Sequence, residues 1–166
     1  LFEDMLEVSY LENLTEPLPR SYLNLCALCR SQLRAMKIRC PKTGVAYADG
    51  IPAETIAVVS SEKYLGVLLS ALLGNAYKFT REGHIRLECG REGDERVYIA
   101  VTDTGCGIPP EKYDQAFERF TKLDPFSQGN GLGLYLCRLI VTRLGGDIRV
   151  CPEYSRGCCI RIELPY

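Results

Sequence analysis

The chain has 166 residues, 46% of them hydrophobic and 25% charged, and its formal net charge at pH 7 is −1. A chain of this length can bury about 70% of the surface of its unfolded form, which predicts one globular domain that needs no disulfide or metal for stability. The near-zero charge argues against a nucleic-acid-binding domain, which needs a basic stripe. The longest nearly apolar stretch, 64–74, is shorter than the roughly 20 residues that cross a bilayer.

The first residues, Leu1–Asp4, are acidic and lack the basic region of a secretory signal. Nine cysteines are present, among them Cys26, Cys29 and the adjacent Cys158–Cys159. A structural zinc site would need a second pair or a histidine at ligand spacing, and the single histidine, His84, is far away in sequence. An odd cysteine count without a signal predicts reduced cytosolic thiols, with a metal or redox role as the alternative.

Apolar residues at helical spacing predict a first helix over 1–13. This helix is too short to stand alone, so we expect it to be the end of an upstream module. A second helix is predicted over 21–36, with Ser21 as its N-cap. Residues 37–60 contain short strand-like pieces, of which 55–59 is the clearest.

Ser61 is expected to cap a long helix that runs to about Phe79, because its leucines recur at i, i+3, i+4 and i+7. A β-hairpin follows. Apolar and polar residues alternate over 84–88 and 97–103, on either side of a polar turn. The two elements predict a helix packed against an antiparallel pair.

A helix is predicted over 110–120 because prolines precede it, then a loop over 123–130 and a third strong helix over 132–144. Two alternating strands, 148–150 and 160–164, complete the chain. These elements predict an α/β two-layer sandwich, in which helices pack on one face of a β-sheet. Its hairpins make the sheet mixed rather than purely parallel, which excludes a Rossmann domain.

Three positions on the 61–79 helix, Ala71, Asn75 and Lys78, share one flank beside the leucine stripe. An amide oxygen such as that of Asn75 can coordinate magnesium together with phosphate oxygens. The Lys78 ammonium is a compact positive charge that suits phosphate. By itself the pair is also typical of a solvated helix face.

The segment Asp103-Thr104-Gly105-Cys106-Gly107-Ile108 follows a predicted strand. An ionised Asp accepts a hydrogen bond from an exocyclic amine such as adenine N6, and such a bond contributes about 1.5–3 kcal/mol. Glycines allow the backbone to turn sharply and to approach a flat ligand closely. The alternative interpretation is a tight turn without a ligand.

A second glycine-rich segment, Gly129-Asn130-Gly131-Leu132-Gly133-Leu134, opens the predicted 132–144 helix. Successive backbone N–H groups at a helix N-terminus form an anion-binding nest, and glycines remove the Cβ atoms that would block a phosphate. The pattern alone is also compatible with a flexible turn.

In this order and at these spacings, the three motifs resemble the N, G1 and G2 boxes of the Bergerat-type (GHKL) ATP-binding superfamily. Three further segments resemble its sensor histidine kinase branch (HATPase_c): Phe117-Glu118-Arg119-Phe120, which resembles the F box, Asn75-Ala76-Tyr77-Lys78-Phe79-Thr80 and the terminal Glu163-Leu164-Pro165. The resemblance covers residues 16–166, the expected catalytic and ATP-binding domain. It implies that residues 1–15 are the end of the dimerisation helix and a linker.

The resemblance also implies residue roles. Asn75 would coordinate magnesium, Lys78 would contact phosphate, and Lys122 would face the γ-phosphate. Asp103 would bind adenine N6, and residues 109–130 would form a mobile ATP lid. The remaining binding residues would shape the base pocket (Gly105, Gly107 and Ile108) and hold the phosphates (Gly129, Gly131, Leu132, Gly133 and Leu134).

One position departs from the family pattern. The N box usually has a second Asn one turn before the magnesium ligand, and ATP-hydrolysing relatives have a water-activating Glu there, but this chain has Ala71. Alanine cannot act as a general base, which argues against intrinsic ATPase activity. The chain also shows no phosphoacceptor, since His84 opens a predicted strand and does not lie on a dimerisation helix.

The resemblance therefore implies the catalytic domain of a two-component sensor histidine kinase that uses ATP and Mg²⁺. The domain would transfer the γ-phosphate to a histidine on an upstream dimerisation domain of the same, homodimeric protein, for relay to a response regulator receiver domain. We expect this chain alone, which does not begin with Met, to be an autophosphorylation-inactive fragment of a cytoplasmic portion of a membrane-associated sensor.

Two alternatives remain open. With Ala71 in its N box, the chain could be a degenerate nucleotide-binding module with a docking or regulatory role. It could also be a kinase of partner serines, as in anti-sigma regulators of this fold, although the 1–13 helix and the F box disfavour this.

Overall fold

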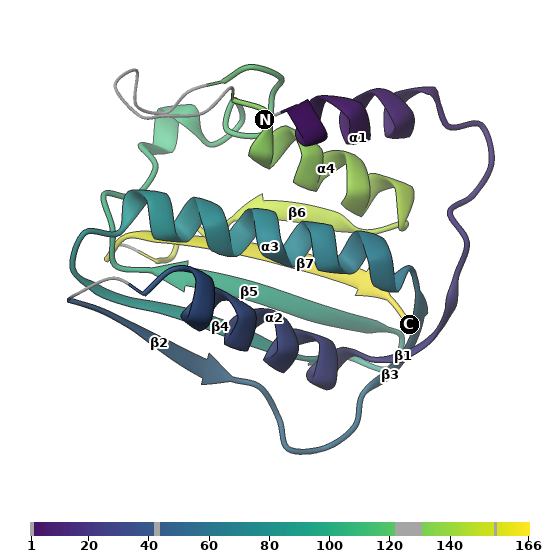
Figure 1. The fold of residues 1–166 in the computed structure, drawn as a ribbon, viewed down its shortest axis with the longest axis horizontal. Helices are drawn as coiled ribbons and strands as arrows, with labels where there is room; N and C mark the ends of the chain where they lie inside the picture. Colours follow the sequence, from purple (N-terminus) through teal and green to yellow (C-terminus); the bar gives the residue numbers. More distant parts are fainter. Residues whose placement is uncertain (1, 42–43, 122–130, 155) are drawn as a thin grey trace.

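A computed structural model describes residues 2–41, 44–121, 131–154 and 156–166. In Figure 1, helices lie one above another across a β-sheet. The elements in chain order are α1 (Phe2–Asn13), β1 (Ser21–Asn24), α2 (Leu25–Arg39), β2 (Val45–Gly50), β3 (Ala57–Ser60), α3 (Glu62–Phe79), β4 (Gly83–Glu92), β5 (Arg96–Asp103), the 3₁₀ helix η1 (Pro110–Lys112), α4 (Gly133–Arg143), β6 (Asp147–Val150) and β7 (Cys158–Pro165).

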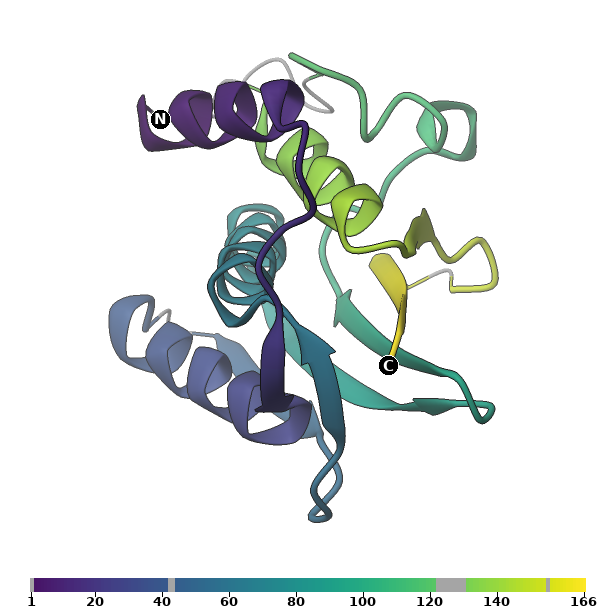
Figure 2. The ribbon, with the colours of Figure 1, turned by 90° about the vertical axis from the view of Figure 1, so that its right-hand side faces the viewer.

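The main sheet has five strands in the order β2-β4-β5-β7-β6, and β1 pairs with β3 in a separate two-stranded sheet. β2 runs parallel to β4, whereas the other neighbours in the main sheet are antiparallel. Figure 2 shows the helices on one side of this sheet. The predicted two-layer sandwich with a mixed sheet is therefore confirmed, and β5, which carries Asp103 at its end, is the central strand.

α3 lies between α2 and α4 and forms the middle of the core. The predicted cap is correct, since the Ser61 hydroxyl accepts a hydrogen bond from the Tyr64 N–H at 3.2 Å. The predicted leucine stripe faces the sheet and is buried, which fixes the rotation of the helix and turns the flank with Asn75 and Lys78 away from the core.

The predicted start of the second helix is wrong. Residues Ser21–Asn24 form β1, which pairs with β3, and α2 begins only at Leu25. The cap is Asn24, not Ser21, because the Asn24 side chain accepts a hydrogen bond from the Cys26 N–H at 3.1 Å. The same oxygen also accepts from the Ile56 N–H at 3.4 Å, a long-range contact that holds β1 beside the segment before β3.

The helix predicted over 110–120 is also wrong. Only Pro110–Lys112 is helical, as a 3₁₀ turn, and a series of turns follows. Most backbone bonds there join residues three apart, such as Glu118 N–H to Gln115 O at 3.0 Å, and Phe120 has a left-handed φ of 61°. Phe117 is nevertheless buried, from an irregular segment.

α1 is a helix, as predicted, and it packs against α4. Val8 and Leu11 are buried in the common core. At the end of α1, the Glu12 carboxylate accepts a hydrogen bond from the Tyr135 hydroxyl at 2.9 Å and pairs with Arg119 at 3.2 Å. The assignment of residues 1–15 to an upstream module stays a prediction. None of the described helices is both long and apolar enough to cross a membrane.

Candidate nucleotide-binding site

One end of the candidate site is the carboxylate of Asp103, the last residue of β5, which is only 3% exposed. Its Oδ1 accepts two backbone hydrogen bonds, from Gly105 N–H at 2.9 Å and from Cys158 N–H at 3.3 Å. Burial raises the pKa of Asp103 above its usual value, and these two bonds lower it in part. The carboxylate is thus held in one orientation, and Oδ2 takes part in neither bond.

The turn after Asp103 is fixed by close backbone contacts. A Cβ atom on Gly105 would lie 2.2 Å from the carbonyl oxygen of Phe79, and one on Gly107 would lie 2.8 Å from that of Gly157. Gly107 also has a φ of 73°, which disfavours a side chain. The glycines therefore let this turn pass between the end of α3 and the connection from β6 to β7.

A small hollow of about 30 Å³ opens beside this turn. Three of the residues predicted for the base pocket line it: Asp103, Gly107 and Ile108. Gly105 stands behind it, against the end of α3. Since the hollow holds little more than one water, a purine base would have to push its lining apart in order to enter.

The other end is a cavity of about 1320 Å³ between α1, α2, α3 and the start of α4. Asn75 and Phe79 line both this cavity and the small hollow, so the two spaces meet at the end of α3. The Lys78 ammonium lies 5.3 Å from the Phe79 ring centroid. The predicted residues that line the large cavity are Asn75, Lys78, Gly131, Gly133 and Leu134, together with Ala71.

The glycine-rich start of α4 presents backbone donors to this cavity. Gly131 has a φ of 71°, and its Cβ would lie 2.5 Å from the Phe120 carbonyl carbon, whereas a Cβ on Gly133 would have no atom of the described residues within 4 Å. Leu132 is the N-cap and is buried in the core, and among the described residues no side chain makes a capping bond there. The first N–H groups and the helix dipole suit an anion such as phosphate.

Two predicted residues, Lys122 and Gly129, lie outside the described residues, as does Asn130 of the G2 box. Leu132 contributes to the core beneath the site rather than to its wall. The described residues contain no cluster of three or more His, Cys, Asp or Glu side chains able to hold a metal ion. The amide oxygen of Asn75, on the cavity wall, is a group that could coordinate magnesium together with oxygens of the ligand.

Three residues that line the small hollow, Phe79, Cys106 and Cys158, were not among the predicted binding residues. Cys158 enters the site because β5 and β7 pair in a register that places it opposite Asp103. Alternating patterns predict each strand but not the register between strands so far apart in the chain. The adjacency of Cys106 to two pocket glycines was the only sequence signal for any of the three.

The sequence matches the family model HATPase_c, described as histidine kinase-, DNA gyrase B-, and HSP90-like ATPase, over residues 60–166. It is 33% identical over 168 residues to the adaptive-response sensory kinase SasA of Gloeothece citriformis, covering 99% of this chain and 43% of that protein. It is 38% identical over 103 residues to the sensor protein SrrB of Staphylococcus aureus, covering 59% of this chain and 18% of that protein. The chain thus spans less than half the length of these relatives.

Solved structures agree with the sequence matches. Full-length ShkA in complex with AMPPNP has a TM-score of 0.84 and 30% identity, covering 98% of this chain and 34% of that one. The catalytic domain of the histidine kinase ThkA in a nucleotide-free form has a TM-score of 0.79 over 89% of this chain and 98% of that one; its 24% identity supports the fold alone. This chain belongs to the HATPase_c family, and within it to the catalytic, ATP-binding domains of sensor histidine kinases.

Proposed function

We propose that this domain binds Mg-ATP and transfers the γ-phosphoryl group to a histidine on a dimerisation domain of the same protein. The observation that carries the proposal is the convergence of two unlike surfaces on Asn75: the buried Asp103 carboxylate on one side and the glycine-rich start of α4 on the other. A nucleotide has a matching asymmetry, with an amine-bearing base at one end and anionic phosphates at the other.

In this proposal each residue has one task. Asp103 accepts a hydrogen bond from the amine of the base, while Gly105, Gly107 and Ile108 shape its pocket. The phosphates are surrounded by the backbone N–H groups of the G2 box, which belong to Gly129, Gly131, Leu132, Gly133 and Leu134. Asn75 and Lys78 approach the phosphates from the flank of α3, and Lys122 faces the γ-phosphate.

The transfer breaks the bond between the γ-phosphorus and its bridging oxygen, which leaves with ADP, and forms a bond from phosphorus to an imidazole nitrogen. Catalysis of this kind is mostly positioning and neutralisation of charge. Lys78 and Lys122 would supply positive charge, and magnesium, when bound, would neutralise charge on the phosphate oxygens. Ala71 lines the cavity and offers no base to activate water, which favours transfer over hydrolysis.

The acceptor histidine would come from outside this chain. His84 is exposed at the start of β4, where its backbone N–H donates to the Thr104 hydroxyl at 3.0 Å, and it lines neither the hollow nor the cavity. We therefore expect this chain alone to bind nucleotide without autophosphorylation. In the whole protein, a homodimeric sensor with this domain on the cytoplasmic side of a membrane, the phosphoryl group would pass to a response regulator receiver domain.

Calorimetric titration of this chain with ATP, with and without magnesium, tests the binding step. An Asp103→Asn variant should bind ATP roughly ten- to hundredfold more weakly, since it loses a charge-assisted bond of about 1.5–3 kcal/mol. Asp94→Asn, in the exposed turn between β4 and β5, is the matched control and should bind like the parent. Equal affinity of all three proteins would contradict the assigned role of Asp103.

A second function, a degenerate nucleotide-binding module with a docking role, is favoured by one observation: Ala71 stands on the cavity wall where the family usually has an amide. Autophosphorylation of the longer protein with Mg-ATP separates the two functions. An acid-labile, alkali-stable phosphoryl group supports a phosphohistidine, and an acid-stable one supports a serine kinase. Nucleotide binding without any phosphorylation of the longer protein supports the docking module.

A further inference from the structure

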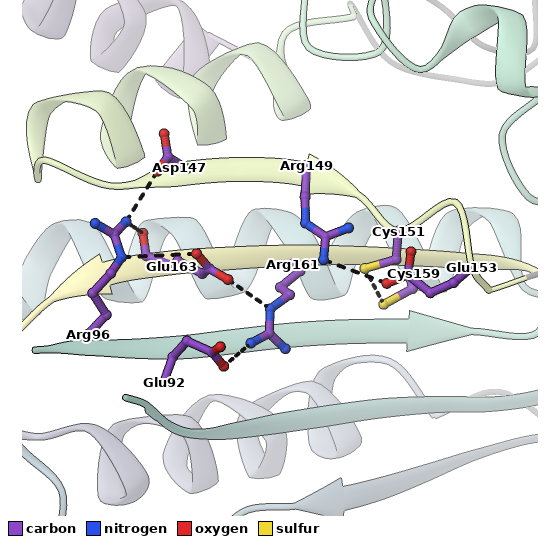
Figure 3. A network of polar contacts seen from close by, with 9 residues as sticks. All are labelled: Glu92, Arg96, Asp147, Arg149, Cys151, Glu153, Cys159, Arg161 and Glu163. Carbon is purple, nitrogen blue, oxygen red and sulfur yellow. Dashed lines mark hydrogen bonds and ion pairs between the residues drawn. The ribbon is translucent and has the colours of Figure 1, made fainter. Parts of the chain in front are cut away.

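Two cysteines face each other on the outer surface of the sheet. Cys151 directly follows β6 and Cys159 lies in β7, and their sulfur atoms are 3.1 Å apart (Figure 3). The Cys151 N–H donates to the carbonyl oxygen of Cys159 at 2.8 Å, which continues the antiparallel register of β6 and β7 by one pair. Neither residue has a role in the proposed nucleotide site.

Their placement suits a disulfide. Residues directly opposite in an antiparallel pair have Cα atoms about 4.5–5.5 Å apart, within the roughly 4.4–6.8 Å range of disulfides. Because the two strands are already hydrogen-bonded, only small side-chain movements are needed to join the sulfurs. The core pair Cys26 and Cys89 differs, since its sulfurs are 3.9 Å apart and both residues are almost completely buried.

Charged side chains fix the surroundings of the pair. On the same face, Arg161 pairs with Glu92 at 2.6 Å and with Glu163 at 3.2 Å, and Arg149 pairs with Glu153 at 3.6 Å (Figure 3). The helices cover the opposite face of the sheet. The backbone pairing of β6 and β7 holds the two cysteines opposite each other, and the half-buried Cys159 lies within reach of a small oxidant.

We propose that Cys151 and Cys159 are a thiol modification site, at which a hydroperoxide forms an intramolecular disulfide. The Cys159 thiolate attacks the O–O bond, becomes a sulfenic acid and releases water or an alcohol. The Cys151 sulfur then attacks the sulfenic sulfur, the S–S bond forms, and a second water leaves. The dithiol loses two electrons and two protons, and the peroxide is reduced by the same two electrons.

The two thiols differ in pKa and in exposure, as the two reaction steps require. The pKa of Cys159 is lowered to about 7, mainly by its side-chain hydrogen bond with Cys151, with a further contribution from the Thr102 side chain. Partial burial and the charges of Glu88 and Glu153 oppose this lowering. The pKa of the buried Cys151 is raised by the same hydrogen bond and by burial. Cys159 is half-buried whereas Cys151 is only 5% exposed, so Cys159 is the attacking thiol and Cys151 the resolving one.

The site adjoins the base end of the nucleotide pocket. Cys158, next to Cys159, donates its N–H to the Asp103 carboxylate, and Gly157 packs against the Asp103 carbonyl. A disulfide would tie together the two ends of the connection that supports Asp103.

The test uses this chain, reduced and folded, with hydrogen peroxide in small excess. Remaining thiols are then alkylated in denaturant, and the intact mass and the non-reduced peptides are measured. The expected product has lost two hydrogens, contains a Cys151–Cys159 linkage, and is restored by dithiothreitol. Cys89→Ser and Cys106→Ser should give the same linkage, whereas Cys159→Ser should not lose two hydrogens.

A Cys151→Ser variant completes the test, because Cys159 should then stop at a sulfenic acid that dimedone traps. Three outcomes overturn the proposal: nine alkylated cysteines after peroxide treatment, a linkage through any other cysteine, or over-oxidation of Cys159 in the parent without a link to Cys151. None of these measurements depends on nucleotide binding, so the proposed function and this inference can fail separately.

Discussion

The two ends of the candidate pocket are built in opposite ways. At the base end, the protein satisfies its own groups: Asp103 is buried and accepts two backbone bonds, and Gly105 lies against the Phe79 carbonyl. At the phosphate end, α4 starts on glycines, no described side chain makes a capping bond, and no described atom lies within 4 Å of a Cβ on Gly133. The base end is therefore part of the fold, whereas the phosphate end provides donors for a ligand.

This difference predicts whether a substitution changes mainly the stability of the protein or mainly its affinity for phosphates. A change at the base end disturbs packing and hydrogen bonds of the protein, so its effect appears first in stability. A side chain at Gly133 would have no described atom within 4 Å of its Cβ, so its effect appears first in the affinity for phosphates. The predictions below contrast the two ends.

The largest effect is expected for Gly105→Ala. The added Cβ would lie 2.2 Å from the Phe79 carbonyl oxygen, which is backbone and cannot rotate away. We expect the free energy of unfolding to fall by about 3 kcal/mol, measured by urea denaturation. Gly74→Ala is the matched control, because a Cβ there meets nothing within 4 Å, and alanine in this helix should stabilise by about 0.5–1 kcal/mol. Equal stabilities would show that the base end is not packed as described.

The next effect is expected for Gly133→Ala at the phosphate end. Its Cβ would have no atom of the described residues within 4 Å, and Gly133 lines the cavity at the start of α4. We expect unchanged stability and an ATP affinity lower by about tenfold, or 1.4 kcal/mol. Adenosine, which lacks phosphates, should bind the parent and the variant equally in calorimetry. A parallel loss of adenosine affinity would contradict the separation of the two ends.

A smaller effect concerns pH. Burial raises the pKa of Asp103, so between the unfolded and folded pKa values the folded state binds more protons than the unfolded state. The contribution of Asp103 to the free energy of unfolding therefore falls as the pH rises through that window. Asp103→Asn removes this titration, so its stability relative to the parent should increase as the pH rises above about 3.9, the pKa of an unfolded aspartate, in denaturation experiments. A difference independent of pH would contradict the raised pKa.

The smallest effect is expected for Tyr135→Phe, which removes the hydroxyl that donates to Glu12 and so loosens α1 from α4. Because the pair is partly exposed, we expect a loss of about 0.5–1 kcal/mol in the free energy of unfolding. Tyr10→Phe, at a residue that is 51% exposed, is the control. Since α1 supports the phosphate end only, adenosine affinity should not change.

The sequence predicted those parts of the molecule that depend on local patterns. The leucine stripe and Ser61 located α3, alternation located β4 and β5, and glycines with Asp103 marked the pocket. Each of these features is a property of residues close together in the chain.

The parts that could not be predicted depend on distant partners. β1 has four residues and is a strand because it pairs with β3. The local sequence does not show this pairing and therefore predicts that these residues belong to the following helix. Cys158 reaches Asp103 through the register of β5 and β7. The segment after Pro110 has helical apolar spacing, but its burial against the core is achieved with turns. In each case tertiary contacts override the local preference.

The strand order has a consequence for the order of folding. β4 and β5 are joined by a short turn, so their hairpin can form within microseconds. β5 and β7 are far apart in the chain, so their pairing must close a long intervening segment and is slower. Since the Cys158 N–H that steadies Asp103 arrives with β7, a chain with only the early hairpin carries the carboxylate without its support. The base pocket should therefore be among the last parts of the molecule to mature.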